Sequence, residues 1–239
     1  MKKSLLILLQ SIIMFSSCVK DNFDGPNARF FGSIRDKVTG DLVETDLING
    51  STIDAYELGF DDPISQKWVI MEDGNFRNNL VFANDYDLFL RNGNFYPVEE
   101  RSFKIKAGDN EHHFQVIPFI RVVNSSIQHD KSGQKIVAKF NLQAGKDEVI
   151  VKNVRLYAFS DMHVGDPVKF DVKYSADRKE NINKQIDSNE QYELSIDLAK
   201  NASIFKPGRD YFFRIGALAS VKNVGTIRHN YAHYVKISL

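Results

Sequence analysis

The residue with the most distinctive chemistry is Cys18, the single cysteine in a chain of 239 residues. It lies in the stretch FSSCVKDNFD, after an apolar run and before a polar segment. A cysteine thiolate is a strong nucleophile toward an activated acyl donor, so a cysteine at a processing site can be acylated. Because the chain has no second cysteine, an intramolecular disulfide is excluded. The type and position of Cys18 therefore predict a covalent lipid modification.

Residues 1–17, MKKSLLILLQSIIMFSS, have the three parts of a secretory signal: a basic start, an apolar core and small residues at the end. The apolar core is shorter than the roughly 20 residues that span a bilayer. A cysteine directly after the small residues resembles a bacterial lipobox, where the chain is cut so that the acylated cysteine becomes its first residue. We expect a lipoprotein signal peptide over 1–17, membrane attachment through Cys18 and a flexible tether over 18–27. The alternative is a buried free cysteine close to an ordinary signal.

The histidines give no metal-binding pattern. His112 and His113 are adjacent on a predicted strand, so their side chains point to opposite faces. His229 and His233 are four residues apart, which is about 13 Å along a strand. The DxDxDG spacing of a calcium loop is missing as well. We expect no metal and no cofactor.

Catalytic patterns are also missing from the sequence. No GxSxG motif and no legible Ser-His-Asp order occurs. The acidic pairs Asp61-Asp62 and Glu99-Glu100 lie in predicted loops. Glycosidases use two carboxylates about 5–10 Å apart, but adjacent acidic pairs are expected by chance among 31 acidic residues. We therefore predict no catalytic residues, and an undetected glycoside hydrolase is kept as a remote alternative.

Aromatic side chains are the better candidates for ligand contact, because sugar rings present apolar CH faces that stack on exposed aromatic rings. Trp68, the only tryptophan, and Tyr96 are the two ligand-binding candidates. Strand alternation places Trp68 on the same face as Ile70, so a core role for Trp68 is the alternative. A binding surface could equally lie on the loops Gly59–Gln66 or Ser160–Pro167.

The charge balance excludes nucleic acid as a partner. Lysine plus arginine and aspartate plus glutamate both number 31. Without the signal peptide the chain keeps 29 basic and 31 acidic residues, a net charge of −2. No basic stripe is present to neutralise phosphates.

Hydrophobicity alternates with period two through most of the chain, as at Ile136–Leu142, Phe170–Tyr174 and Tyr192–Leu198. Turn signals such as TG at 39–40 and DGN at 73–75 interrupt these segments. We expect Gly40 to adopt a positive φ, and Asp73-Gly74 to form a two-residue hairpin turn. The pattern predicts an all-β protein with two tandem β-sandwiches, over residues 28–118 and 119–239.

Several segments together resemble an uncharacterised family of Bacteroidetes surface lipoproteins, domain-of-unknown-function 3823. They include FFGSIRDKVTGDLVETD, IDAYELGF, HFQVIPFIRV and the C-terminal RIGALASVKNVGTIRHNYAHYVKI. The resemblance implies an N-terminal transthyretin-like (carboxypeptidase-regulatory-like) sandwich followed by an immunoglobulin- or fibronectin-III-like sandwich. It also implies an association with polysaccharide-utilisation clusters, with an outer-membrane glycan importer and its partner lipoprotein. The family has no assigned catalytic residues.

These observations favour a non-catalytic lipoprotein that assists glycan capture or import and binds oligosaccharide itself. It would be lipid-anchored in the outer membrane and face the cell exterior. The alternative is a structural lipoprotein that docks on the importer complex and has no ligand of its own. Exposed coplanar aromatics would indicate sugar, and a flat apolar patch would indicate protein.

Overall fold

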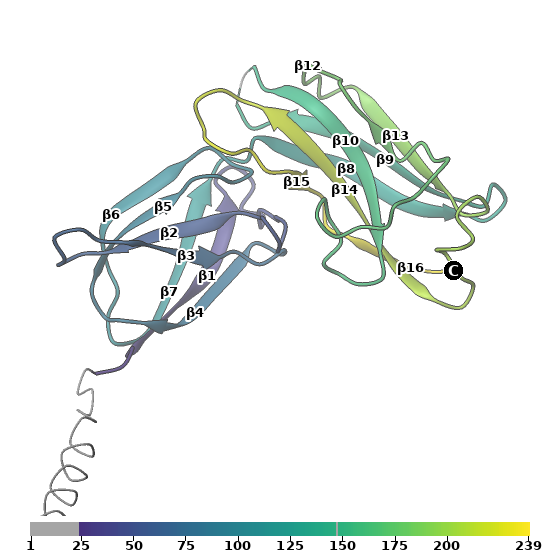
Figure 1. The fold of residues 1–239 in the computed structure, drawn as a ribbon. Coiled ribbons are helices and arrows are strands. Elements are labelled where there is room, and N and C mark those ends of the chain that lie inside the picture. Colours follow the sequence, from purple (N-terminus) through teal and green to yellow (C-terminus); the bar gives the residue numbers. More distant parts are fainter. Residues whose placement is uncertain (1–23, 147) are drawn as a thin grey trace, which may run out of the picture.

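The computed structural model describes residues 24–146 and 148–239, and within these ranges the regular secondary structure is β-strand (Figure 1). The strands are β1 (Ala28–Asp36), β2 (Thr52–Glu57), β3 (Ser65–Val69), β4 (Asn75–Val81), β5 (Asp85–Leu90), β6 (Val98–Lys104), β7 (Gly108–Val116), β8 (Ile120–Asp130), β9 (Lys135–Ala144), β10 (Ile150–Phe159), β11 (Arg178–Lys179), β12 (Lys184–Gln185), β13 (Gln191–Asp197), β14 (Asp210–Ser220), β15 (Asn230–Tyr231) and β16 (Val235–Ser238). The predicted anchor at Cys18 lies outside the described residues.

The first seven strands form one sandwich, the N-terminal domain. One sheet has the order β4-β1-β7 and the other has the order β3-β2-β5-β6. β1 is central in its sheet, antiparallel to β4 and parallel to β7 over its whole length, from Ala28–Gly108 to Asp36–Val116. Inward-facing apolar side chains such as Phe30, Leu88 and Phe114 fill the space between the sheets.

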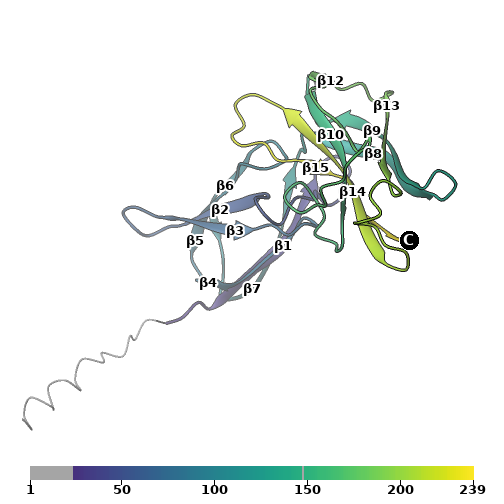
Figure 2. The same cartoon turned by 45° about the vertical axis from the view of Figure 1, so that its right-hand side comes forward.

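The remaining strands form a second sandwich, the C-terminal domain (Figures 1 and 2). Its sheets are β13-β9-β8 and β11-β10-β14-β15, with β12 also on β10 and β16 also on β14. The alternating residues of β9 and β13 supply a separate core that includes Phe140, Tyr192 and Ile196. The prediction of an all-β protein with two tandem β-sandwiches is confirmed.

Two turn predictions can be compared with the backbone. Gly40 has φ +80°, as predicted. Gly74 also has a positive φ, +83°, and Phe76 after it is buried on the return strand. The hairpin closes with the N–H of Met71 donating to Asn75 O (2.7 Å), so its loop has three residues rather than the predicted two.

The predicted strand at Phe170–Tyr174 is wrong. Phe170 donates one backbone hydrogen bond to Ala158 O, but the N–H of Lys173 donates to the side chain of Asn201 (2.8 Å). A buried asparagine therefore takes the place of a neighbouring strand. Among the described residues, no helix is long and apolar enough to cross a membrane.

Candidate functional site at the domain junction

The two sandwiches are joined by buried polar contacts around Arg214 of β14, which is 1% exposed. Its guanidinium donates to Glu44 Oε2 (2.6 Å) and to the carbonyl oxygens of Thr45 and Glu72 in the N-terminal domain. It also donates to the carbonyl oxygens of Val164 and Ala232 in its own domain. These five bonds match the five N–H donors of an arginine, so both domains together satisfy one buried charge.

Two asparagine side chains, those of Asn94 and Asn230, also connect the domains. Asn94 donates to Glu44 O (2.6 Å) and to His229 O (3.0 Å). Asn230 in turn donates to Asn94 O (2.7 Å). Because these amides bond to backbone atoms of the opposite domain, they fix the register between the two sandwiches.

An ion pair forms the third connection. Arg121 of β8 donates through Nε and Nη2 to the two carboxylate oxygens of Asp36 at the end of β1. Burial by itself would raise the pKa of Asp36. The hydrogen bonds and charge of Arg121, with the N–H of Val38, outweigh burial and hold that pKa below its ordinary value.

Asp46 is the junction carboxyl group in the least favourable environment. Burial raises the pKa of Asp46 to about 6, although Tyr231 Oη donates to its Oδ2 (2.8 Å) and Arg214 is close. The carboxylate of Asp166 adds repulsion. A raised carboxyl pKa also occurs in catalytic acids, but Asp46 is 6% exposed and does not line the hollows described below. Its geometry is that of a structural group.

Among the hollows at this junction, two open ones lie on either side of the segment after β14. The Tyr96 hollow has a volume of about 510 Å³. Tyr96 comes from the N-terminal domain, and the C-terminal domain supplies the polar groups of Glu148, Gln185, Ser220 and Lys222. The Tyr96 ring packs on Phe119 and carries the Lys146 ammonium 4.0 Å from its centroid.

The Arg91 hollow has a volume of about 520 Å³. Its lining from the N-terminal domain is Phe89, Arg91, Asn92, Pro97, Val98 and Glu99, and that from the C-terminal domain is Asn223, Val224 and Gly225. The segment Val221–Gly225 separates the two hollows, since residues 220–222 line one and 223–225 line the other. Figures 1 and 2 show this yellow segment between β14 and β15 reaching toward the N-terminal domain.

The segment that forms the C-terminal wall of the Arg91 hollow is held against the N-terminal domain by two hydrogen bonds from backbone N–H groups. The N–H of Thr226 donates to Asn92 Oδ1 (3.0 Å), and the N–H of Arg228 donates to Gly93 O (3.0 Å). Asn92 and Asn223 have positive φ angles of 42° and 61°. Asparagine tolerates this conformation better than most residues, which explains its use at both turns.

Only one of the two predicted ligand-binding side chains lies at a hollow. Tyr96 is partly exposed there. Trp68 is 6% exposed, and its ring packs 5.5 Å from Phe30 and 5.6 Å from Tyr86 in the core. A covered tryptophan ring offers no face to a sugar, so Trp68 occupies the core position that was the alternative to binding.

The acidic pairs and histidines considered in the sequence do not come together in a catalytic or metal-binding arrangement within the described residues. Asp61 and Asp62 are exposed in the hairpin loop after β2. Glu100 Oε1 lies within hydrogen-bond distance of His112 Nε2 (3.0 Å), whereas Glu99 faces the Arg91 hollow. Within residues 24–146 and 148–239, no group of three histidine, cysteine or acidic side chains is placed to hold a metal ion.

Sequence reasoning missed most of the hollow-lining residues, including Arg91, Asn92 and Asn223. The signals were present, because NGN at 92–94 and KNVG at 222–225 are turn sequences. Their meeting across the domain junction is a long-range contact that no local pattern encodes.

The fold and junction define a class of protein: two β-sandwiches joined rigidly through a buried arginine, with ligand-sized hollows beside the joint. The chain belongs to the DUF3823 family. Residues 28–117 match the model described as "Protein of unknown function (DUF3823) N-terminal domain", and residues 120–236 match "Domain of unknown function (DUF3823_C)".

Solved structures agree with this membership. A protein from Bacteroides uniformis, described as "a putative carbohydrate binding protein", is 47% identical, with 90% of this chain and 100% of that chain covered and a TM-score of 0.85. A DUF3823 family protein from Parabacteroides merdae shares the fold at 20% identity, 90% and 100% coverage and a TM-score of 0.68. Another from Bacteroides uniformis does so at 19% identity, the same coverage and a TM-score of 0.66. No curated protein matches the chain.

Proposed function

We propose that this chain is a non-catalytic cell-surface lipoprotein that binds oligosaccharide at the domain junction and so assists glycan capture or import. The observation that carries the proposal is the Tyr96 hollow. It combines a partly exposed aromatic ring with side-chain amide, hydroxyl, ammonium and carboxylate groups, in a protein that is 47% identical to one described as "a putative carbohydrate binding protein".

The chemistry of this hollow suits a sugar. Pyranose CH groups can pack on the free part of the Tyr96 ring, while Gln185 and Glu148 at its rim can pair with hydroxyl groups. Among the described residues, nothing forms a hydrogen bond with the Gln185 amide. Because Arg214, Asn94 and Asn230 fix the two walls, little conformational freedom is lost when a ligand binds.

The test is a glycan-binding assay with the chain from Val19 to Leu239, which contains both cores in full. Gln185→Ala and Tyr96→Ala should each weaken binding about tenfold. Tyr96→Phe, which keeps the packing on Phe119, should retain it. Trp68→Phe should lower thermal stability without changing affinity. Binding that survives both Ala substitutions would reject this site.

Docking on an importer is the second candidate, and the hairpin between β2 and β3 favours it. Its loop exposes two large apolar side chains, Phe60 (64%) and Ile64 (83%). Under this proposal Phe60→Ser with Ile64→Ser would abolish capture of the importer complex. If the double variant still captured the importer, this hairpin would be excluded as the docking surface.

A further inference from the structure

We infer that the Arg91 hollow recognises the carboxylate of a uronic acid unit, so that the glycan bound at the junction is acidic. This inference rests on the proposed oligosaccharide binding and adds a substrate class to it. The carrying observation is an exposed arginine in a ligand-sized hollow, held in place by an aromatic ring and left without an acidic partner.

The guanidinium of Arg91 is oriented by Phe89. Its Cζ lies 3.7 Å from the ring centroid, and Arg101 lies over the same ring at 4.3 Å. Together with the Tyr56 ring 5.5 Å away, the two arginines nearly bury Phe89, although its side chain lies on the sheet face opposite the core. Stacking occupies the face of a guanidinium and leaves its N–H edges free, which is the geometry that a carboxylate engages through two parallel hydrogen bonds.

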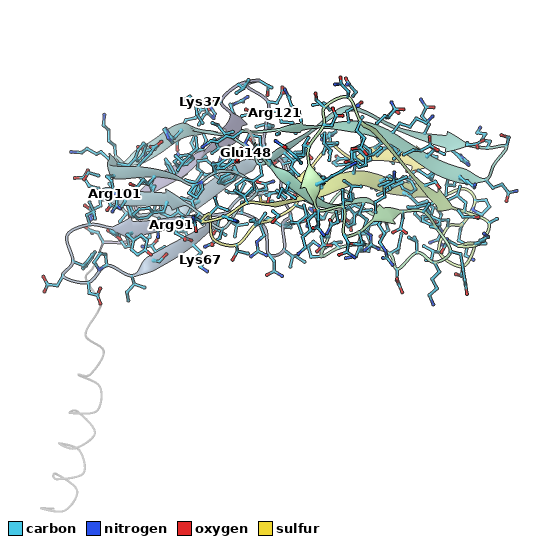
Figure 3. The ribbon with its side chains drawn as sticks, turned by 90° about the horizontal axis from the view of Figure 1, so that it is seen from above. Lys37, Lys67, Arg91, Arg101, Arg121 and Glu148 are labelled. Atoms are coloured by element: carbon cyan, nitrogen blue, oxygen red, sulfur yellow. The ribbon has the colours of Figure 1, made fainter. Side chains whose placement is uncertain are left out.

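Charge pairing distinguishes Arg91 from its neighbour. Arg101 is paired with Asp87 (2.8 Å) and Glu99 (3.3 Å). In contrast, no carboxylate of the described residues forms an ion pair with Arg91. Figure 3 shows Arg91 beside the yellow loop that closes the hollow, and Arg101 farther from that loop. Arg91, the arginine nearer the C-terminal wall, is therefore the one of the two whose charge has no carboxylate partner among the described residues.

A further polar group lies on the C-terminal wall of this hollow. The Asn223 side chain lines the hollow, and none of the described residues bonds to its amide. A sugar carboxylate between Arg91 and this wall would find a bidentate donor in Arg91, while Asn223 could bond a ring hydroxyl.

The Arg91 hollow combines Arg91 with the apolar residues Pro97, Val98 and Val224. A neutral sugar needs an open aromatic face, but the Phe89 ring is covered by guanidinium groups. A uronate needs the guanidinium edges, which remain available.

The experiment measures binding of the Val19–Leu239 chain to oligomers of polygalacturonate, alginate and hyaluronan, which carry uronates from plant, algal and animal sources. Methyl-esterified polygalacturonate, xyloglucan and mannan serve as uncharged counterparts. We expect binding to at least one uronate oligomer, loss on methyl esterification where polygalacturonate binds, and weakening as salt rises. The uronate that binds identifies the source.

Variants of Arg91 test whether the uronate carboxylate binds at this residue. Arg91→Ala should weaken uronate binding at least about tenfold, and Arg91→Lys should restore only part of it, because lysine keeps the charge but loses the two-bond geometry. Arg77→Ala is the matched control, since Arg77 stacks on Phe31 (5.1 Å) on the other sheet of the same domain, and it should bind as wild type.

Two outcomes would overturn the inference in different ways. Binding of a neutral glycan that is weakened by Gln185→Ala but not by Arg91→Ala would keep the proposed function and reject the acidic class. Absence of binding to every glycan would reject both.

Discussion

Burying an arginine removes its charge from water, and at Arg214 five hydrogen bonds compensate for that loss. Three of the acceptors belong to the N-terminal domain and two to the C-terminal domain. The ring of Tyr231, 4.1 Å from the guanidinium carbon, adds a cation–π contact. Removing the side chain would leave Glu44 Oε2 and several carbonyl oxygens without the donor they have in Arg214, and breaking a buried ion pair is strongly destabilising.

We therefore expect Arg214→Met to lower the free energy of unfolding by about 3–5 kcal/mol, measured by denaturant titration. Arg209→Met is the control, because Arg209 is exposed near the start of the same strand and should change stability by less than about 0.5 kcal/mol. Equal losses in the two variants would contradict a special role for Arg214.

Asp46 gives a prediction about pH. Its folded-state pKa is raised from 3.8 to about 6, so the folded protein prefers the protonated carboxyl. The associated stability is fully present below about pH 3.8 and is lost as pH rises through about 6. Asp46→Asn, which resembles the protonated form and can still accept from Tyr231, should be more stable than wild type at pH 8, by up to about 3 kcal/mol.

The measurement is the melting temperature of both proteins from pH 4 to pH 8. The advantage of Asp46→Asn should shrink toward zero at the acidic end. An advantage that is constant with pH would show that the carboxyl group does not titrate differently in the folded state.

At the scale of elements, the β-hairpin that joins β3 and β4 depends on a glycine. Gly74 has φ +83°, and a Cβ there would lie 2.7 Å from Val43 O, which is backbone that cannot easily move. Gly40 has a similar φ of +80°, but a Cβ there would meet nothing within 4 Å. A substitution at Gly40 therefore introduces only the strain of a positive φ, whereas one at Gly74 adds a steric clash.

We expect Gly40→Ala to cost about 1 kcal/mol from the left-handed conformation alone. Gly74→Ala should cost at least about 1 kcal/mol more, because the methyl group must displace the backbone segment that contains Val43. Thermal unfolding of the two variants gives the comparison. Similar losses of stability in the two variants would mean that the hairpin can shift to accommodate the methyl group at little energetic cost.

Comparison of particular elements shows which structural information is local. Alternation at Ile136–Leu142 and Tyr192–Leu198 predicted two strands that pair along their length, because each needs only a period of two and a core to face. Phe170–Tyr174 has the same alternation but bonds to Asn201 instead of to a strand. Alternation reports which residues are buried and does not identify their hydrogen-bond partners.

The same limit applies to the candidate site. Tyr96 and Trp68 were the two aromatic candidates, and strand alternation left both a binding and a core role open for Trp68. The packing of the whole molecule places Tyr96 at the rim of a hollow and Trp68 in the core. The junction contact between Asn94 and Asn230 spans 136 residues along the chain, so no window of local sequence contains it.

At the scale of the whole molecule, the two sandwiches should unfold as one unit. Each has its own core, but neither satisfies Arg214, Asn94 or Asn230 alone. We expect a single calorimetric transition whose calorimetric and van't Hoff enthalpies agree. In Arg214→Met the transition should broaden or divide. Two separate transitions in the wild-type protein would contradict this coupling.

Under the proposed attachment through Cys18, the position of β1 has a mechanical consequence. The described chain enters at the end of the N-terminal domain that is farther from the C-terminal domain, and β1 runs from there to Asp36, which pairs with Arg121 across the junction (Figure 1). A tension between the anchor and a glycan held at the junction would pull along this strand. The load would then act in shear on the two ladders to β4 and β7, whose hydrogen bonds share it, rather than peel them apart one at a time. Under the proposed function, β1 would therefore resist the force of a glycan polymer that is being pulled away from the cell.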